Sequence, residues 1–176
     1  MSAEPLRDRI FCEWLTAHRG IMARVASSFA RGGPDRLDLE QEIMLQVWSS
    51  AESFGAQSKA STWIYRVSLN TALMWSRGLG RRQRGIDPGG SIDGVPAGTA
   101  SPDEAAAKDD LLEKLYEAIR SLPDTDRALV LMSLDGLAYR EMSEITGLTE
   151  NHIGVALTRA RSKLAERLKG VRNELE

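Results

Sequence analysis

The sequence is short of several residue types, and each shortage excludes a class of protein. Its one cysteine, Cys12, excludes an internal disulfide and a multi-cysteine metal site, and fits a reducing compartment. Its two histidines, His18 and His152, lie far apart in the sequence. No apolar run approaches the ~18 residues of a membrane span, and the start of the chain lacks the pattern of a secretion signal. We therefore expect a cytoplasmic protein that does not insert into membranes.

The chain also has little net charge, but that charge is unevenly distributed. In total, 23 Lys and Arg stand against 25 Asp and Glu, a net charge of -2. Residues 1–84 hold 12 basic and 8 acidic residues, whereas residues 85–110 hold 1 basic and 6 acidic residues. Residues 111–176 hold 10 basic and 11 acidic residues, and six of the basic ones lie between 151 and 173. Two basic surfaces that flank an acidic segment are compatible with a nucleic-acid ligand, although a basic run is also typical of a solvated helix face.

Hydrophobic residues recur with a helical period throughout the ordered stretches, and nowhere alternate as in strands. The middle of the chain is rich in Gly and Pro, a linker composition. We therefore predict an all-α chain with two small helical domains, at 5–77 and 103–170, joined by a flexible acidic linker at 78–102. The individual helices are expected from about residue 5 to a break before residue 21, and then near 21–30, 35–53, 62–77, 103–121, 124–134, 139–146 and 150–169.

The second predicted domain contains a helix-turn-helix pattern between Tyr139 and Arg161. Gly147 makes the turn, and Met142 and Ile153 are among the apolar residues that fix the helix crossing. The second helix would fit a DNA major groove, with its arginines contacting phosphates more than bases. Any compact helical domain can show helix, glycine and helix, so DNA binding is one of two interpretations. The outward residues of this helix are Asn151, His152, Val155, Thr158, Arg159 and Arg161.

The first predicted domain combines aromatic, basic and amide side chains on one helix, from Thr62 to Asn70. Such a mixture suits single-stranded nucleic acid, because aromatic rings stack on bases and cations follow the backbone. The alternative is that Trp63 and Tyr65 are core residues, which for Trp63 is at least as well supported because it lies in step with Val67.

These motifs together resemble regions 2 and 4 of bacterial RNA polymerase sigma factors. The region 2 resemblance rests on Asp38-Leu39-Glu40-Gln41-Glu42, Trp48, Phe54, Thr62-Trp63-Ile64-Tyr65-Arg66 and Asn70. The region 4 resemblance rests on Ser121-Leu122-Pro123, Gly136-Leu137-Ala138-Tyr139, Glu141-Met142, Gly147-Leu148 and Arg159-Ala160-Arg161-Ser162-Lys163-Leu164. With these two regions alone, the chain is similar to the extracytoplasmic-function (ECF, group 4) members of the sigma-70 family.

The resemblance implies a sigma factor that binds core RNA polymerase, directs promoter-specific initiation and is commonly held by an anti-sigma factor. Contacts to the clamp helices of the largest polymerase subunit would involve Asp38, Leu39, Gln41, Glu42 and Gln46, and region 4 would touch the flap. The single-stranded −10 element would be bound by Phe54, Ser58, Lys59, Ser61, Thr62, Trp63, Arg66, Asn70 and Arg77, with Arg81, Arg82 and Arg84 following phosphates. The −35 duplex would be bound by Asn151, His152, Val155, Thr158, Arg159, Arg161 and Lys163.

Competing interpretations stay open. No phosphate-binding loop, metal-spaced cluster or nucleophile motif supports an enzyme or a cofactor. A stand-alone helix-turn-helix regulator that does not act through polymerase is the main alternative, and a protein that sequesters a partner is another. The family usually carries basic residues where this chain has Gly154 and Ala156, which questions the strength of −35 recognition. Cys12 is expected to be buried and inert rather than redox-active.

Overall fold

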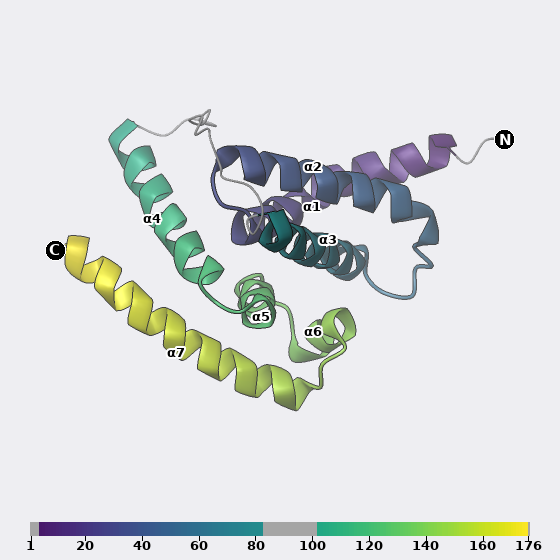
Figure 1. Cartoon of the computed structure of the whole chain (residues 1–176). Helices are drawn as coiled ribbons and strands as arrows, with labels where there is room; N and C mark the ends of the chain where they lie inside the picture. The colour runs from purple at the N-terminus through teal and green to yellow at the C-terminus, as the bar shows by residue number, and fades with distance from the viewer. Residues whose placement is uncertain (1–3, 83–101, 176) are drawn as a thin grey trace. The chain divides into compact units, whose positions relative to one another are not determined.

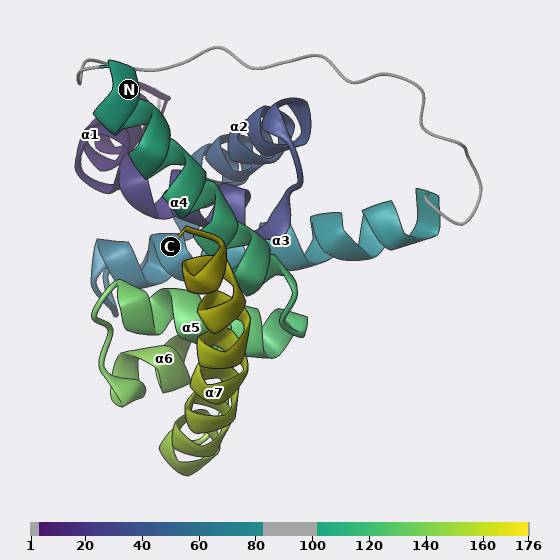
Figure 2. The same cartoon turned by 90° about the vertical axis from the view of Figure 1, so that its left-hand side faces the viewer.

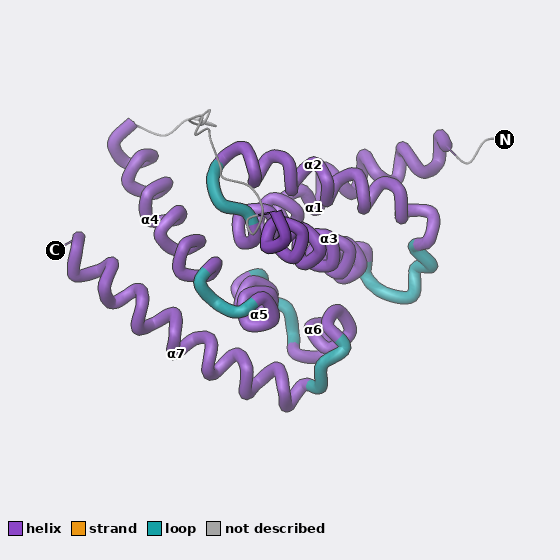
Figure 3. The backbone as a smooth tube through the Cα atoms, viewed as in Figure 1, coloured by secondary structure: helices purple, strands orange, loops and turns teal. Residues whose placement is uncertain are grey.

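The computed structural model describes residues 4–82 and 102–175, and every regular element in them is helical (Figure 3). The chain divides into two compact units, Met1–Ile92 and Asp93–Glu176. The all-α prediction is confirmed. Most of the predicted linker, residues 83–101, lies outside the described residues.

The first unit is built from three long helices, α1 (Glu4–Phe29), α2 (Gly33–Ser50) and α3 (Ala60–Arg82), with a short 3-10 turn, η1 (Ala51–Ser53), after α2. Each long helix contacts the other two, as Figure 1 shows for the purple, blue and teal ribbons. They meet because each carries an apolar stripe with a period of 3.6 residues. The stripes bury Trp14, Met22, Val25, Ala26, Phe29, Leu39, Ile43, Val47, Ile64, Tyr65, Leu69 and Ala72.

Ser28, Ser68 and Thr71 place hydroxyl groups within this core, where an unpaired polar group would be costly. Each donates to the carbonyl oxygen four residues earlier in its own helix: Ser28 to Arg24 at 2.8 Å, Ser68 to Ile64 at 2.7 Å and Thr71 to Val67 at 2.9 Å. Small residues can therefore stand at the helix contacts without leaving a donor unsatisfied.

The second unit consists of α4 (Pro102–Arg120), α5 (Asp124–Leu134), α6 (Tyr139–Thr146) and α7 (Glu150–Leu175). The helices α4, α5 and α6 all contact α7, the yellow-green helix in Figure 1. The predicted bounds of α5 and α6 are confirmed. Glycines end these two helices: Gly136 has φ 77° and Gly147 has φ 74°, left-handed values that a glycine adopts at little cost.

Four local predictions are wrong. The break expected before residue 21 is absent, because α1 passes through Gly20, beside which the Arg24 side chain packs. The helix α3 runs five residues past its predicted end at Arg77. Cys12 is exposed, because it lies two residues, about 200° of helix, from the buried Trp14. The helix α7 runs six residues past its predicted end at residue 169.

Within the described parts of the chain, no helix combines the length and the apolar content needed to cross a bilayer. The same residues contain no group of three or more His, Cys, Asp or Glu side chains placed to hold a metal ion. Pro102 is the first residue of α4, where a missing N–H is harmless.

Candidate nucleic-acid interface

The helix α2 presents a polar face that contains four of its five predicted polymerase-binding residues. Asp38, Gln41 and Gln46 are exposed and Glu42 is half-buried. The amide of Gln46 donates to the carboxylate of Glu42 across 3.3 Å, one helical turn apart. The fifth residue, Leu39, is 0% exposed, because the apolar stripe of α2 turns it into the core. Leu39 therefore supports this face from beneath and is removed from the set of contact residues.

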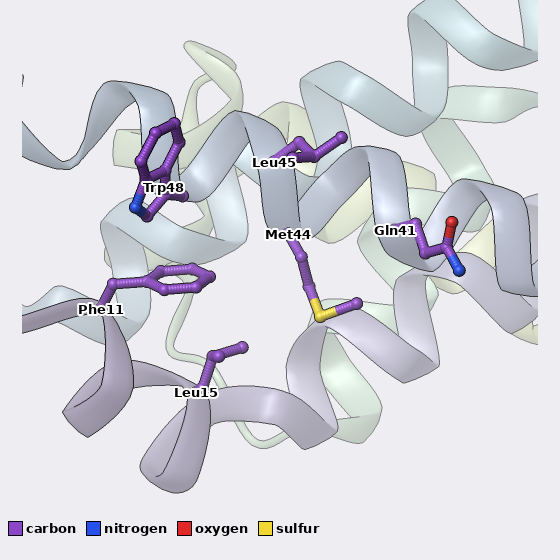
Figure 4. A pocket seen from close by; sticks show the side chains of 6 residues that line it. All are labelled: Phe11, Leu15, Gln41, Met44, Leu45 and Trp48. Atoms are coloured by element: carbon purple, nitrogen blue, oxygen red, sulfur yellow. The ribbon is translucent and has the colours of Figure 1, made fainter. Parts of the chain in front are cut away.

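An apolar groove of about 510 Å³ lies beside this face, between α1 and α2. In Figure 4, Phe11 and Leu15 rise from α1 toward Met44 and Trp48 of α2, and the amide of Gln41 lies at one end. Leu45 completes the lining and is 59% exposed. Sequence reasoning missed the groove as a site. The sequence does contain an indication of this groove. The apolar stripe of α2 includes Leu45 and Trp48 as well as Ile43 and Val47, and is therefore wider than packing against the core requires.

Three aromatic rings join α1, the 54–59 loop and the start of α3. Trp14 lies 5.1 Å from Phe54 and 5.3 Å from Trp63, and Phe54 lies 5.6 Å from Trp63, all measured between ring centroids. The core interpretation of Tyr65 is confirmed, since its side chain is buried. Trp63 packs in this cluster but is only half-buried. Part of its ring therefore stays accessible at the edge of the loop.

The predicted −10 residues gather along one stripe of α3. Trp63, Arg66, Asn70 and Arg77 succeed one another at steps of three, four and seven residues, which places them on one helix face. Asn70 and Arg77 are exposed and Arg66 is half-buried. Met74 lies on the same stripe and is 71% exposed. The stripe is therefore a mixed aromatic, basic and amide surface, as the sequence predicts for a single-strand site.

The remaining predicted −10 residues lie at the start of this stripe. Lys59 is exposed, Ser58 and Ser61 are half-buried, and Thr62 is buried. Thr62 lies beside the aromatic stripe on the core side of α3, so its hydroxyl has little surface to offer a ligand. Ala56 in the same loop has a positive φ of 53°, unusual for a residue with a side chain. The side chains of Arg81, Arg82 and Arg84 lie outside what the structure describes.

A second groove, of about 450 Å³, brings the two predicted sets together between α2 and α3. Glu42 and Gln46 line it from α2, and Asn70 lines it from α3. The other lining residues are Val67, Thr71, Met74 and Trp75. Residues assigned to polymerase and to DNA therefore share one continuous surface of the first unit.

In the second unit, hydrogen bonds define the turn between α6 and α7. The amide of Gly147 donates to the Ser143 carbonyl at 2.8 Å, which ends α6. The hydroxyl of Thr149 accepts from the His152 amide at 3.3 Å, so Thr149 caps the start of α7. At the start of α6, Glu141 accepts from the Ala138 amide at 3.0 Å. The helix-turn-helix geometry is thus fixed locally at each helix end.

Apolar contacts fix how α7 lies on α6, because Met142, Ile145, Ile153 and Leu157 are buried. Ala156 is also buried, so its position faces the core and could not offer a basic side chain to DNA. Ala156 is therefore no longer a difference from the family pattern that would weaken −35 recognition. At the other difference, Gly154, an added Cβ would lie 3.5 Å from the Tyr139 ring, an ordinary contact distance.

Four uncharged side chains are exposed on the first turns of α7, where Glu150 and Arg159 are also exposed. Asn151, His152, Val155 and Thr158 are all exposed, and the Thr158 hydroxyl donates to the Gly154 carbonyl at 2.9 Å. These four are the residues that the sequence places toward base edges.

The three basic residues of the same predicted set have partners inside the unit. Arg159 donates to the Asp126 carboxylate at 3.1 Å, and Arg161 donates to the Ser133 hydroxyl at 2.7 Å. The ammonium group of Lys163 lies 3.9 Å from the other oxygen of Asp126. Sequence reasoning could not find these pairs, because about 30 residues separate the partners.

Comparisons with known proteins match both units. Residues 14–82 match the model for sigma-70 region 2, and residues 112–164 match the model for sigma-70, region 4. The ECF RNA polymerase sigma-E factor of Escherichia coli is 29% identical over 154 residues, which cover 80% of this chain and 78% of that protein. The sigma-E factor of Haemophilus influenzae is 28% identical over 138 residues, covering 74% and 73%.

Two solved structures share the fold. The sigma factor RpoE of Bartonella quintana, in complex with the anti-sigma factor NepR, aligns with a TM-score of 0.69 at 22% identity, covering 92% of this chain and 98% of that one. CnrH, in complex with the cytosolic domain of CnrY, aligns with a TM-score of 0.65 at 18% identity, covering 93% and 90%. Both sigma-70 regions are present and in order, and so the chain belongs to the ECF sigma factors of the sigma-70 family.

Proposed function

We propose that the chain binds core RNA polymerase and directs it to promoters by recognising a −35 duplex and a single-stranded −10 element. The observation that carries the proposal is one chain with two different nucleic-acid surfaces. The first unit has an aromatic, basic and amide stripe on α3, and the second has a helix-turn-helix. Members of the family act by binding, so we infer a non-catalytic role, performed in the cytoplasm where polymerase works.

The polymerase site would be the polar face of α2 together with the α1–α2 groove. Gln41 lines the apolar groove that contains Leu45 and Trp48, and the exposed Asp38 lies about one helical turn before Gln41 on α2. An apolar groove with an acidic residue nearby suits partner helices that present apolar and basic side chains together. The clamp helices of the largest polymerase subunit are the partner that the family implies.

The −10 site would be the stripe from Trp63 to Arg77, entered from the 54–59 loop. The accessible part of the Trp63 ring would stack on a base, and the Asn70 amide would hydrogen-bond to base edges. Arg66 and Arg77 would follow the phosphates. Phe54 and Trp14 would act indirectly, by packing behind Trp63 and fixing its orientation.

The −35 site would be the four uncharged side chains exposed on the first turns of α7, with Asn151 and His152 nearest the start of the helix, as in other helix-turn-helix proteins. An amide and an imidazole can each hydrogen-bond to base edges in a major groove, and Val155 can contact a thymine methyl group. The face therefore has the chemistry for direct recognition of bases.

Of the two solved neighbours, RpoE holds the anti-sigma factor NepR and CnrH holds the cytosolic domain of CnrY. We propose that a comparable factor regulates this chain by covering the α1–α2 groove, since that surface is apolar, open and needed for polymerase.

Transcription from purified components tests the function. The chain would be mixed with core polymerase, complex formation measured by native gel electrophoresis, and run-off products sequenced from a library of promoters. We expect a stable complex and initiation from a subset of templates that share −35 and −10 sequences. A stand-alone regulator would bind duplex DNA without polymerase and give no run-off product, and that result would refute the proposal.

A further inference from the structure

Three basic residues that the sequence assigns to DNA are held by the helix beneath them. The carboxylate of Asp126, on α5, accepts from Arg159 at 3.1 Å and lies 3.9 Å from Lys163. The hydroxyl of Ser133, near the other end of α5, accepts from Arg161 at 2.7 Å. In Figure 2, α5 crosses behind α7. The contacts at Asp126 and at Ser133 join the two helices at two separate points.

The two contact points lie on opposite sides of α7. Arg159 and Arg161 are two residues apart, so their side chains leave the helix about 200° apart. Their partners Asp126 and Ser133 are seven residues apart, which is about 10 Å along the axis of α5. Two bonds on opposite flanks prevent a helix from rolling about its own axis, whereas a bond on one flank would not.

The burial of Asp126 explains why its carboxylate pairs with Arg159. The Asp126 side chain is 3% exposed, and a buried carboxylate needs a cation beside it. Its second oxygen has no hydrogen-bond partner among the described residues, and the ammonium group of Lys163 lies 3.9 Å from it. The side chains of Arg159 and Lys163 are themselves 59% and 46% exposed, so they neutralise this acid from the surface of the domain. A cation that is paired with a buried acid is less available to a DNA phosphate.

We propose that Asp126 and Ser133 are positioning residues of the duplex-binding surface. They set the rotation of α7, so that Asn151, His152, Val155 and Thr158 face outward, and they keep Arg159, Arg161 and Lys163 from DNA phosphates. Duplex recognition then rests on the four uncharged side chains. The inference rests on the proposed function, because it takes the −35 duplex as the ligand.

Retention on phosphocellulose tests the restraint without any promoter. Asp126→Asn in the full chain releases Arg159 and Lys163, so this variant should elute at higher salt than the wild-type chain. The matched control is Asp110→Asn, which makes the same charge change at an exposed ion pair with Lys114 on α4. If the two variants elute together, the cations were never withheld and the proposal is wrong.

Binding to duplex DNA tests the positioning. Fluorescence anisotropy over a salt series would compare a −35 duplex from a promoter found in the run-off assay with a scrambled duplex. For Asp126→Asn, we expect the slope of log K against log salt to steepen by about 0.9 per released cation. The preference for the promoter duplex should fall several-fold. Arg159→Gln breaks the same contact without releasing a cation, so it should lose preference without a steeper slope.

Two further results separate positioning from simple destabilisation. Asp126→Glu keeps the charge and should restore both slope and preference. A variant that is only less folded loses affinity for both duplexes equally, with an unchanged slope, and that outcome would overturn the inference. If the chain fails to bind core polymerase, the proposed function fails, while the phosphocellulose comparison still decides whether Asp126 withholds the two cations.

Discussion

The indole rings of Trp14 and Trp63 pack against each other with centroids 5.3 Å apart and planes at 49°. Trp14 comes from α1 and Trp63 from the first turn of α3, and Phe54 closes the cluster from the loop between α2 and α3. One buried side chain of the first helix therefore fixes the entrance of the proposed single-strand site. Stability and DNA binding are coupled at this point.

Replacing Trp14 with Ala should cost about 3–5 kcal/mol in the free energy of unfolding, because it leaves a large cavity beneath Phe54 and Trp63. Urea unfolding of the full chain measures this loss, taken from the unfolding transition of the first unit. Trp48→Ala is the control, since Trp48 is half-buried in the open α1–α2 groove and should cost clearly less. Equal losses would mean that the aromatic cluster has no special structural role.

The two glycines near the start of α7 should respond to alanine with opposite signs. Gly147→Ala forces a side chain into the left-handed region at φ 74° and should destabilise by about 1–2 kcal/mol. Gly154→Ala lies within the helix, meets only an ordinary contact with Tyr139, and should stabilise by up to about 1 kcal/mol. Thermal unfolding of both variants checks the signs, and a destabilised Gly154→Ala would show that the Tyr139 ring cannot accommodate a methyl group.

Leu45→Glu should weaken binding to core polymerase on the order of tenfold or more while leaving the fold intact, because it places a charge in the apolar groove. The matched control is Leu134→Glu, an equally exposed leucine of the second unit (62% against 59%). Native gel titration with core polymerase compares the two. If both variants bind as the wild-type chain does, the groove is not the polymerase site.

Asn70→Ala should impair binding of a single-stranded −10 oligonucleotide by about tenfold and leave −35 duplex binding unchanged. Asn70 is exposed on α3, so its removal should not affect folding. Asn151→Ala, on α7, should do the reverse. Anisotropy with the two probes, using the polymerase complex, distinguishes these outcomes, and equal effects of Asn70→Ala on both probes would argue against a single-strand role.

The sequence was sufficient where local chemistry decides the structure. The ends of α5 and α6 were predicted correctly because Pro123, Gly136 and Gly147 act within a few residues of themselves. The apolar residues Ile43 and Val47 of α2 are buried as their helical spacing indicates, because an apolar residue every three or four positions defines one helix face.

It was insufficient where the outcome depends on residues far apart in the chain. Gly20 was read as a break, but packing of α1 against α2 and α3 outweighs the propensity cost of one glycine, about 1 kcal/mol. Met74 follows the apolar period yet faces outward with Asn70. The acceptors of Arg159 and Arg161 belong to another helix, and no spacing within α7 indicates them.

The outward face of α7 has a consequence for how such proteins diversify. Asn151, His152, Val155 and Thr158 contribute almost nothing to the buried core, which is formed by Ile153, Ala156, Leu157 and Ala160 on the opposite side. Under the proposed −35 assignment, single substitutions at the four outward positions would change which promoters are chosen without lowering stability. Duplicated copies of such a gene can acquire new sets of target genes one residue at a time, while the helix that carries the change stays in place.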